Sequence, residues 1–574
     1  MQYLASMFGG VKVEDSAESS PAAGPSNAGV TRLFRFAKGQ WKLEEENPEV
    51  SFYNECEEQD LEGFDHFVDI GKEIRQRIIP DMDMQFNTPD LECTFRAEGQ
   101  GVYCLRFAAR EQYDRFANEF ENRMFENQNN TEFTQEALVA AFGGEKNAGL
   151  ALAWGRAEDP ADMAMDIDGD PEEEESAKAS HRLDKEPADG TYSLMEVGAG
   201  ERSYAVRGGV VDVFKNHHGG VEAADVAINL TPVRAGQRGG GVVATPEFHT
   251  PSRAMLVQNE QGMLMLTPGA ADRPSAMKLD LERETVVGRY GFQQNGVSLG
   301  IKEIQHEHKA AGLEGTPTFL ALNANGKQIS RFDMRAGNTP VQDVAGADGF
   351  MGWTGGTSYK SNMKFNAVAT TGAGELVTGS DDGMIRLYRS KDSMSRAVTA
   401  YPGYGHPITA IDVTHDGKMI VATCDSYLIL VFTAFRDASG AVLKAFTKSL
   451  NSKGAETFAP RMLKLKPQDA ERLGPGEVFR NAKFNWVTES GVKERWIIAH
   501  VGKKSVMWSV ARAASTKGRR GGGAILVTDY FIDEKAEDVR DARLMHDNHR
   551  NVNGDDAAVV LTDHFIWTCD DDDE

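Results

Sequence analysis

Short apolar runs recur along the C-terminal two thirds of the chain, separated by Gly, Asp and Asn. In the stretch GSDDGMIRLY (379–388), Ile385 and Leu387 alternate with residues of the opposite face. The Asp-Gly pair at 382–383 tolerates positive φ and is expected to supply a two-residue hairpin turn. A period of two directs one apolar face inward, as in a half-buried strand. Because helical periodicity nearly vanishes after Gly190, this part of the chain is predicted to be all β.

The hairpin recurs 43 residues further along the chain (417 minus 374). GELVTGSDDGMIRLY (374–388) aligns with GKMIVATCDSYLILV (417–431), and their apolar positions coincide. Asp382 matches Asp425, and the small residue Ser380 matches Thr423. A period of 40–45 residues with four strands per unit indicates a β-propeller of the WD-repeat type.

Five looser copies of the strand–turn–strand unit flank this pair, which makes seven units in all. They lie at 203–216, 253–268, 318–335, 495–510 and 557–569. The fold class is therefore predicted to be mainly β, with a propeller of about seven blades over residues 191–569. A two-sheet sandwich plus a further domain is the alternative, although 385 residues (190–574) exceed an ordinary sandwich.

The segment GYGHPITAIDV places a Gly-His pair before the inner strands of one repeat. In WD repeats such a histidine bonds an Asp of the later turn, so His406 is expected to pair with Asp425. Asp382 and Thr423 are expected to belong to the same structural network. The position one repeat before His406 is Met363, so the network is not kept in both repeats. A catalytic base is the alternative role for His406.

Residues 29–127 are predicted to form a small α+β domain, after a disordered segment over 1–28 that is rich in Ser, Ala, Pro and Gly. TRLFRFAKGQWKL (31–43) is expected to form two strands around the turn at Lys38-Gly39. Near the end of the domain, large apolar residues recur at helical spacing and predict one helix packed on a sheet. They are Tyr113, Phe116, Ala117, Phe120 and Met124.

Residues 128–190 are predicted to be an acidic linker with at most a short helix near its start. Between positions 158 and 189 there are 13 acidic and 3 basic residues, a composition that repels itself and stays extended. An acidic tail, 570–574, ends the chain.

The charge of the whole chain narrows its partners. A net charge of −25 argues against nucleic-acid binding and against docking on anionic membranes, because both need a basic footprint.

The five cysteines are scattered without a C-x-x-C pair, so neither disulfides nor structural zinc is expected. Neither a signal peptide nor a run of 18 apolar residues is found, which predicts a cytoplasmic protein without integral membrane contact, the nucleus remaining open.

Motifs of catalysis are not found. The chain has no G-x-x-x-x-G-K-[ST] phosphate loop and no G-x-S-x-G elbow. The Gly-rich segments 236–242 and 518–524 are expected to be mobile loops. The histidines of HEH (306–308) and of His217-His218 lack further zinc ligands, and are expected to be ordinary surface residues. We therefore predict no catalytic, cofactor-binding or metal-binding residues and no enzyme activity. An enzyme with its site in the propeller channel is the alternative, although no convergent acidic or histidine cluster is evident.

Residues 366–431 resemble the C-terminal domain of the vacuolar import and degradation family, member twenty-seven of that series. DVFKNHHGGVE (212–222) and FNWVTESGVKERWIIAHVGKKSVMW (484–508) also agree, and the match is collinear over about residues 190–550. The resemblance implies a WD-like propeller in the cytoplasm and carries no catalytic residues. The family name suggests protein trafficking or turnover, and its plant members are linked to embryo and meristem development.

RLFRFAKGQWKLEEE (32–46) and GVYCLRFAAREQYDRFANEFEN (101–122) resemble the first and last parts of a Ran-binding-type pleckstrin-homology-like domain. This resemblance implies a sheet wrapped around a C-terminal helix that binds peptides or the small GTPase Ran. Leu43, Glu44 and Glu45 stand where that family has a basic residue and Gly. Because Ran presents an acidic tail, these carboxylates would weaken that mode of binding.

Two groups of residues are expected to contact protein partners. The first surrounds the first turn, and the second lies in the basic stretches that follow the fifth repeat, which could also receive the acidic linker or a phosphorylated peptide. The groups are Arg35, Lys38, Trp41 and Lys42, and Lys464, Lys466, Arg519 and Arg520. The predicted function is a protein-binding adaptor or scaffold, with a regulator of Ran as a second alternative. Phosphoinositide binding through Arg35, Lys38 and Lys42 is not expected, because these three basic residues stand among carboxylates.

Overall fold

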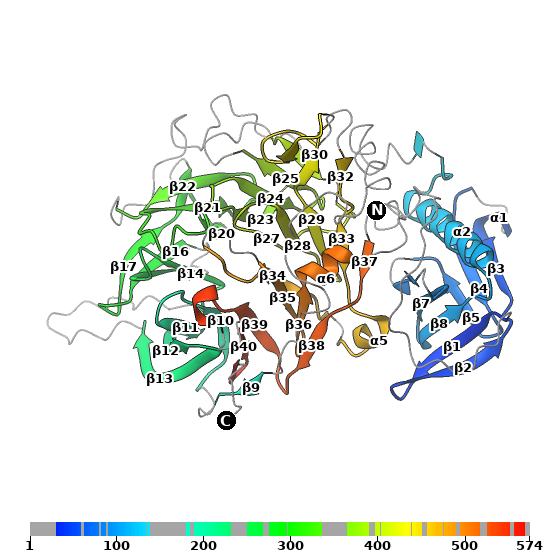
Figure 1. Cartoon of the computed structure of the whole chain (residues 1–574), viewed down its shortest axis with the longest axis horizontal. Helices are drawn as coiled ribbons and strands as arrows, with labels where there is room; N and C mark the ends of the chain where they lie inside the picture. The colour runs from blue at the N-terminus through cyan, green and yellow to red at the C-terminus, as the bar shows by residue number, and fades with distance from the viewer. Residues whose placement is uncertain are drawn as a thin grey trace.

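The computed structural model contains two folded domains side by side, a small N-terminal domain and a large ring of sheets (Figure 1). It describes residues 30–137, 180–183 and 189–568, with gaps at 59–61, 80–81, 88–89, 135, 231–249, 268–274, 295–296, 336–363, 390–396, 402, 438, 451–455, 475, 489–493, 517–524 and 551–555. The predicted N-terminal disordered segment, most of the predicted linker, both Gly-rich segments and the acidic tail lie outside the described residues.

The N-terminal domain consists of two antiparallel sheets and a long helix. The five-stranded sheet has the order β2-β1-β8-β7-β6, and the second sheet has the order β3-β4-β5. The strands are β1 (Arg32–Ala37), β2 (Gln40–Glu46), β3 (Val50–Asn54), β4 (His66–Ile70), β5 (Ile74–Arg77), β6 (Gln85–Asn87), β7 (Glu92–Ala97) and β8 (Gly101–Arg106), and the helices are α1 (Glu55–Glu58) and α2 (Arg110–Asn129). The core lies between the sheets and α2.

Local sequence explains the two ends of this domain. Lys38 and Gly39 both have positive φ, 55° and 78°, which a two-residue hairpin turn between β1 and β2 requires. The five apolar residues predicted to form one helical stripe are all buried on α2. The predicted hairpin at 31–43 and the predicted C-terminal helix are thus confirmed.

The large domain is a propeller of seven sheets. The first blade contains β10 (Tyr192–Glu196), β11 (Arg202–Arg207), β12 (Val210–His217) and β13 (Gly220–Asn229); the second contains β14 (Arg253–Val257), β15 (Gly262–Thr267), β16 (Ser275–Asp280) and β17 (Thr285–Tyr290); and the third contains β20 (Ile301–His306), β21 (Thr318–Asn323) and β22 (Ile329–Asp333). The fourth contains β23 (Phe365–Thr370), β24 (Leu376–Ser380), β25 (Ile385–Tyr388) and β26 (Thr399–Tyr401), and the fifth contains β27 (Ala410–Val413), β28 (Met419–Thr423), β29 (Leu428–Phe432), β33 (Arg461–Leu463) and β37 (Ile525–Val527). The sixth contains β34 (Arg480–Phe484), β35 (Trp496–Val501), β36 (Lys504–Ser509) and β38 (Phe531–Glu534), and the seventh contains β39 (Val539–Leu544), β40 (Ala558–Thr562), β41 (Ile566–Thr568) and β9 (His181–Arg182). The hairpin β18 (Phe292–Gln294) and β19 (Val297–Leu299) lies between the second and third blades in sequence.

Each of the seven repeats predicted from the sequence supplies a hairpin to a different blade, so the predicted mainly β propeller of about seven blades is confirmed. One detail of the first hairpin was wrong. β24 and β25 are joined by four residues rather than two, because the Gly383 amide bonds the Ser380 carbonyl at 3.0 Å and closes a wider turn. Gly383 has a φ of 76°, and an added Cβ would lie 2.8 Å from the His406 carbonyl oxygen, so this turn requires Gly.

The ring is closed by a strand from the other end of the domain. β9 precedes the first blade in sequence, yet it pairs with β41 of the seventh through Arg182↔Trp567 and His181↔Thr568. Two residues of the predicted linker therefore belong to the seventh blade. The pairing of β9 with β41 brings the two ends of the propeller domain into one sheet. Opening the ring would therefore break this pairing.

The fifth blade is extended by an insertion that also reaches the sixth. β37 lies in sequence between β36 and β38 of the sixth blade, but it pairs in parallel with β33 of the fifth. The short helix α6 (Val510–Ser515) follows β36, and the inserted segment between β29 and β33 forms a three-stranded sheet. That sheet contains β30 (Ala434–Arg436), β31 (Val442–Lys444) and β32 (Glu456–Thr457). The buried side chain of Arg461 on β33 contacts α6.

The same insertion carries the contact with the N-terminal domain. The Gln85 side-chain amide donates to the Leu465 carbonyl oxygen at 3.1 Å, and the Lys464 ammonium pairs with the Asp83 carboxylate. The short helix α5 (Pro467–Ala470) follows and lies between the two domains (Figure 1). One buried hydrogen bond and one largely buried ion pair thus connect the two domains here.

Candidate functional site

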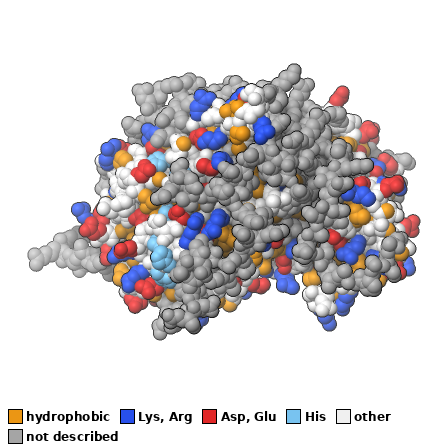
Figure 2. All heavy atoms as spheres, in the orientation of Figure 1, with side chains coloured by type: hydrophobic (Ala, Val, Ile, Leu, Met, Phe, Trp, Pro, Cys, Tyr) orange, Lys and Arg blue, Asp and Glu red, His pale blue; other side chains and the backbone are white. Residues whose placement is uncertain are grey.

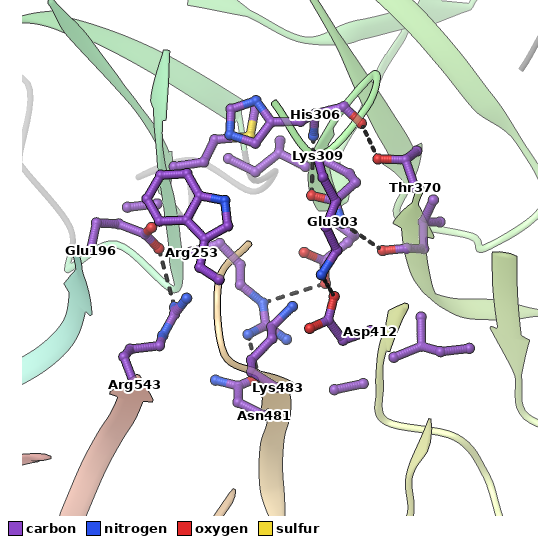
Figure 3. A pocket seen from close by; sticks show the side chains of 18 of the residues that line it. Glu196, Arg253, Glu303, His306, Lys309, Thr370, Asp412, Asn481, Lys483 and Arg543 are labelled. Carbon is purple, nitrogen blue, oxygen red and sulfur yellow. Dashed lines mark hydrogen bonds and ion pairs between the residues drawn. The ribbon is translucent and has the colours of Figure 1, made fainter. Parts of the chain in front are cut away.

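A cavity of about 190 Å³ lies where the first strands of the seven blades surround the propeller axis. Every first strand contributes to its lining. The residues, one from each strand in blade order, are Glu196, Arg253, Glu303, Val368, Asp412, Lys483 and Arg543. Lys309, Asn481 and His306 add to this set, and Figure 3 shows the polar side chains pointing toward one another across the cavity. We call this cavity the channel site.

Ion pairs that join different blades organise the channel site. Arg253 Nε lies 3.3 Å from Glu303 Oε2, and Arg253 Nη1 donates to Asn481 Oδ1 at 2.5 Å. Lys309 Nζ lies 3.1 Å from Asp412 Oδ1. These pairs tie blade two to blades three and six, and blade three to blade five.

The seventh blade is tied to the first in the same way. Arg543 Nη2 lies 3.1 Å from Glu196 Oε1, and its Nε lies 3.2 Å from Asp541 Oδ2. The Met195 amide donates to the same Asp541 oxygen at 3.3 Å. Arg543 is thus held in place by a carboxylate in the cavity and by a second, fully buried one behind it.

Lys483 differs from the other three cations of the channel site. Among the residues that the structure describes, none lies within hydrogen-bond or ion-pair distance of its ammonium group. The Asp412 carboxylate, which attracts Lys483 electrostatically, is engaged by Lys309 and accepts from the Phe484 amide at 3.0 Å. Burial lowers the pKa of Lys483, and the neighbouring Arg543 acts in the same direction.

Burial also shifts the carboxyls of the site. Although burial favours the neutral form of Asp412, Lys309 and Lys483 hold its pKa below the ordinary value. At Glu196 burial prevails over the opposing charge of Arg543 and raises the pKa to about 7. Glu196 therefore changes its charge near neutral pH, whereas Asp412 stays ionised.

We expect Glu196 to make the propeller less stable as the pH rises. Its pKa of about 7 in the folded state exceeds the ordinary 4.5, so its stabilising proton is fully present below pH 4.5 and is lost toward pH 7. Relative to Glu196→Gln, the free energy of unfolding should fall by up to about 1.4 kcal/mol per pH unit in this window. Urea denaturation at pH 5, 6, 7 and 8 measures it, with the exposed Glu222→Gln as the matched control. Parallel curves for wild type and Glu196→Gln would contradict the prediction.

The predicted propeller network lies in blades four and five, where Asp382 belongs to a turn and Thr423 pairs in register with Ala410, a residue that lines the channel site. Asp382 accepts hydrogen bonds from Ser380 Oγ at 2.6 Å and from the Met384 amide at 3.1 Å, which closes its own turn. Thr423 Oγ1 accepts from the Ala482 amide of the next blade at 3.1 Å. Both are structural contacts.

His406 belongs to the same region but has a different described partner. Its Nδ1 lies 3.1 Å from Tyr427 Oη, while Asp425 is exposed. The bond between His406 and Asp425 stays a prediction.

The predicted partner residues of the N-terminal domain lie on the β1–β2 hairpin. Arg35 pairs in register with Lys42, and Phe36 with Trp41, so the basic and aromatic pairs alternate along the hairpin. Arg35 donates to the Gln100 carbonyl oxygen at 3.0 Å, and Trp41 packs edge-on against Phe36. Lys38 and Lys42 are exposed.

Of the basic residues predicted as partner contacts after the fifth repeat, the two that the structure describes both contact residues of the same chain. Lys464 is engaged with Asp83 of the N-terminal domain, so contact with a partner would require the domains to separate. Lys466 lies over the Tyr530 ring at 5.8 Å, and Arg519 and Arg520 lie outside the described residues. On the face seen in Figure 2, acidic and basic side chains are interspersed over the coloured surface of both domains.

The histidines singled out in the sequence are dispersed. His306 is half-buried at the channel site rather than at the surface, and burial lowers its pKa to about 4. His308 Nε2 lies 3.4 Å from Glu314, and His217 Nδ1 lies 3.0 Å from the His218 carbonyl oxygen. In the described ranges, no group of three or more His, Cys, Asp or Glu could hold a metal ion. None of the described helices has the length and apolar character needed to cross a membrane.

Sequence reasoning missed the channel site, whose charged residues do converge. The available signal was a charged residue in the mostly apolar first strand of a blade, as in YSLME and AIDV, whereas VRDARL carries three charged residues and does not show it. Each such residue can be found from the sequence, but their mutual proximity cannot, because the partners lie 50 to several hundred residues apart.

Seven radial sheets, closed by a strand from the start of the domain, define a WD40-like β-propeller. Residues 191–553 match the family described as the VID27 C-terminal WD40-like domain, and the chain belongs to this family. Residues 30–143 match a domain of unknown function, DUF7135.

Two curated relatives, both called vacuolar import and degradation protein 27, align with the chain. The Schizosaccharomyces pombe protein is 28% identical over 370 residues, which are 62% of this chain and 41% of the relative. The Saccharomyces cerevisiae protein is 25% identical over 341 residues, 58% of this chain and 39% of the relative. The chain thus aligns with about two fifths of the length of either relative.

Among solved structures, the β-propeller domain of Cps50 (Swd1) from Myceliophteria thermophila is similar at a TM-score of 0.41 and 10% identity. The similarity covers 67% of this chain and 98% of that domain.

Proposed function

We propose that this protein is a non-enzymatic, cytoplasmic scaffold that binds other proteins and acts in vacuolar import and degradation. The observation that carries the proposal is the match of residues 191–553 to the VID27 WD40-like domain. The names of the two yeast relatives suggest the pathway. A propeller offers a rigid ring whose loops can hold several partners at fixed positions.

The N-terminal domain is proposed to be a pleckstrin-homology-like module that recruits a partner. Its two antiparallel sheets, with a 20-residue helix at the C-terminal end, support this assignment. Its β1–β2 hairpin presents Lys38 and Lys42 to solvent. Direct binding to GTP-bound and GDP-bound Ran would separate a Ran effector from a general adaptor, since an effector prefers the GTP form.

Affinity capture from the native cell, followed by mass spectrometry, tests the scaffold. The full chain is compared with a chain that lacks residues 30–134 and with the double variant Lys38→Glu/Lys42→Glu. Partners that stay when residues 30–134 are removed are assigned to the propeller, and partners lost in both variants are assigned to the hairpin.

A cellular readout connects capture with the pathway. Deleting the gene is expected to lengthen the half-life of proteins that the cell degrades in its vacuole, and the full chain should restore it. Normal vacuolar degradation in the deletion strain would contradict the pathway. The absence of any specific partner with the full chain would contradict the scaffold.

A further inference from the structure

The lining of the channel site contains one more cation than carboxylates, and a further carboxylate, Asp541, pairs with Arg543 behind the lining. The lining itself holds Arg253, Lys309, Lys483 and Arg543 against Glu196, Glu303 and Asp412. Each of the three carboxylates is paired with an arginine or with Lys309 at 3.1 to 3.3 Å. The cation that these pairs leave over is Lys483.

An ammonium in such a position needs a counterion. Lys483 is half-buried inside the ring, in a chain whose net charge is −25, and no described residue lies within bonding distance. Three like charges, Arg543, Lys309 and Arg253, act on it electrostatically against the attraction of Asp412, which is itself engaged by Lys309. A cation held beside other cations away from bulk water is costly unless an anion joins them.

The donors around the cavity match a tetrahedral oxyanion. Lys483, Arg253 and Arg543 come from three different strands, β34, β14 and β39, so they approach the cavity from different sides. Each guanidinium has five N–H groups, of which two make the described contacts of Arg253 and two those of Arg543. A planar carboxylate offers two oxygens, whereas a phosphoryl group offers three or four to such a set.

We infer that the channel site binds a small soluble oxyanion of the phosphate class, either free phosphate or a small phosphate ester, with Lys483 as the central contact. The 190 Å³ cavity holds several times the space that one water molecule needs, so it also accommodates a short ester chain. The bound anion would connect strands of three blades around the axis. Such a site is distinct from a surface that binds partner proteins, because it is lined by the inner strands rather than by surface loops.

Isothermal titration calorimetry of the full chain with sodium sulfate, inorganic phosphate and glycerol 3-phosphate tests this inference. Chloride at equal ionic strength is the background. Sulfate is included because it stays doubly charged across the pH range in which phosphate titrates. We expect saturable binding of sulfate and phosphate, and Lys483→Met should weaken it at least about tenfold, because a charge-assisted hydrogen bond is lost.

Lys327→Met is the matched control, because Lys327 is exposed on the turn between β21 and β22 and carries the same charge. It should bind sulfate as wild type does. Lys483→Gln provides a second variant that keeps a polar side chain, in case Lys483→Met fails to fold. Binding of glycerol 3-phosphate as well as phosphate would identify an ester site, and binding of phosphate alone a site for the free anion.

Three results would overturn the inference. The first is a sulfate effect no larger than that of chloride, and the second is equal affinity in wild type and both Lys483 variants. The third is binding of a phosphoserine peptide without binding of any of the small anions, which would assign the site to a protein partner.

Discussion

Replacing Arg461 by Met is expected to lower the free energy of unfolding of the propeller by about 3 kcal/mol or more, since each unsatisfied buried carbonyl costs on the order of 1–3 kcal/mol. Arg461 is 2% exposed and donates from Nε to the Ala513 carbonyl oxygen at 3.0 Å. Its two terminal nitrogens donate to the carbonyl oxygens of Ala459 and Ala514, each at 2.6 Å.

The carbonyls explain why an arginine is needed here. Ala513 and Ala514 belong to the last turn of α6, where carbonyl groups lack partners within the helix and attract positive charge. Met fills much of the same volume but carries no charge, so it loses the cation–π contact with the Phe432 ring, which lies 5.5 Å from the guanidinium carbon. Lys keeps the charge but not the planar fork, so Arg461→Lys should lie between Met and wild type.

Urea denaturation followed by tryptophan fluorescence measures the loss, because Trp508 packs within the same blade region. Arg335→Met is the matched control. Arg335 is exposed and pairs with Asp333 at 2.7 Å, so its loss should cost at most about 1 kcal/mol. A similar small change for Arg461→Met would show that water or another side chain satisfies the three carbonyls.

Arg461 also illustrates what sequence reasoning could and could not reach. In the sequence it stands shortly before Lys464 and Lys466, in a basic stretch that predicts contact with an acidic partner. In the structure it is 2% exposed, and the carbonyl groups at the helix end that it caps lie 52 and 53 residues away in the chain. Charge alone does not report burial, since the compensating carbonyls belong to the backbone and leave no residue-specific signal.

The blades could be predicted because their signal is local. A period of two marks each hairpin, Gly and Asp mark its turns, and the 43-residue offset marks the repeat. Which of the two alternating faces of a strand meets the axis depends on how the blades pack. The convergence of the charged residues at the channel site therefore could not be predicted from the sequence. The same reason applies to β9, whose partner strand lies nearly 400 residues away.

Replacing Lys535 by Met is expected to loosen the closure of the ring and to cost about 3 kcal/mol, as breaking a buried ion pair does. The Lys535 side chain is 1% exposed, and its ammonium lies 2.6 Å from Asp533 and 2.5 Å from Ser180 Oγ. Ser180 immediately precedes β9 and also donates to Asp533 at 2.7 Å. The ammonium lies 4.2 Å above the Trp567 ring, on the strand that pairs with β9.

These contacts place one lysine of the sixth blade between the closing strand and the seventh blade. Its loss leaves the Asp533 carboxylate without its cation and frees Ser180, so the damage should be greatest at the closure. Hydrogen exchange of residues 180–183 and 566–568 should therefore accelerate more than exchange in β27 or β28, and the unfolding midpoint should fall. In the Asp533→Asn/Lys535→Met double variant the losses should be less than additive, since both substitutions break the same pair. Lys327→Met is the matched control, and uniform acceleration throughout the propeller would show that Lys535 stabilises the domain as a whole rather than its closure.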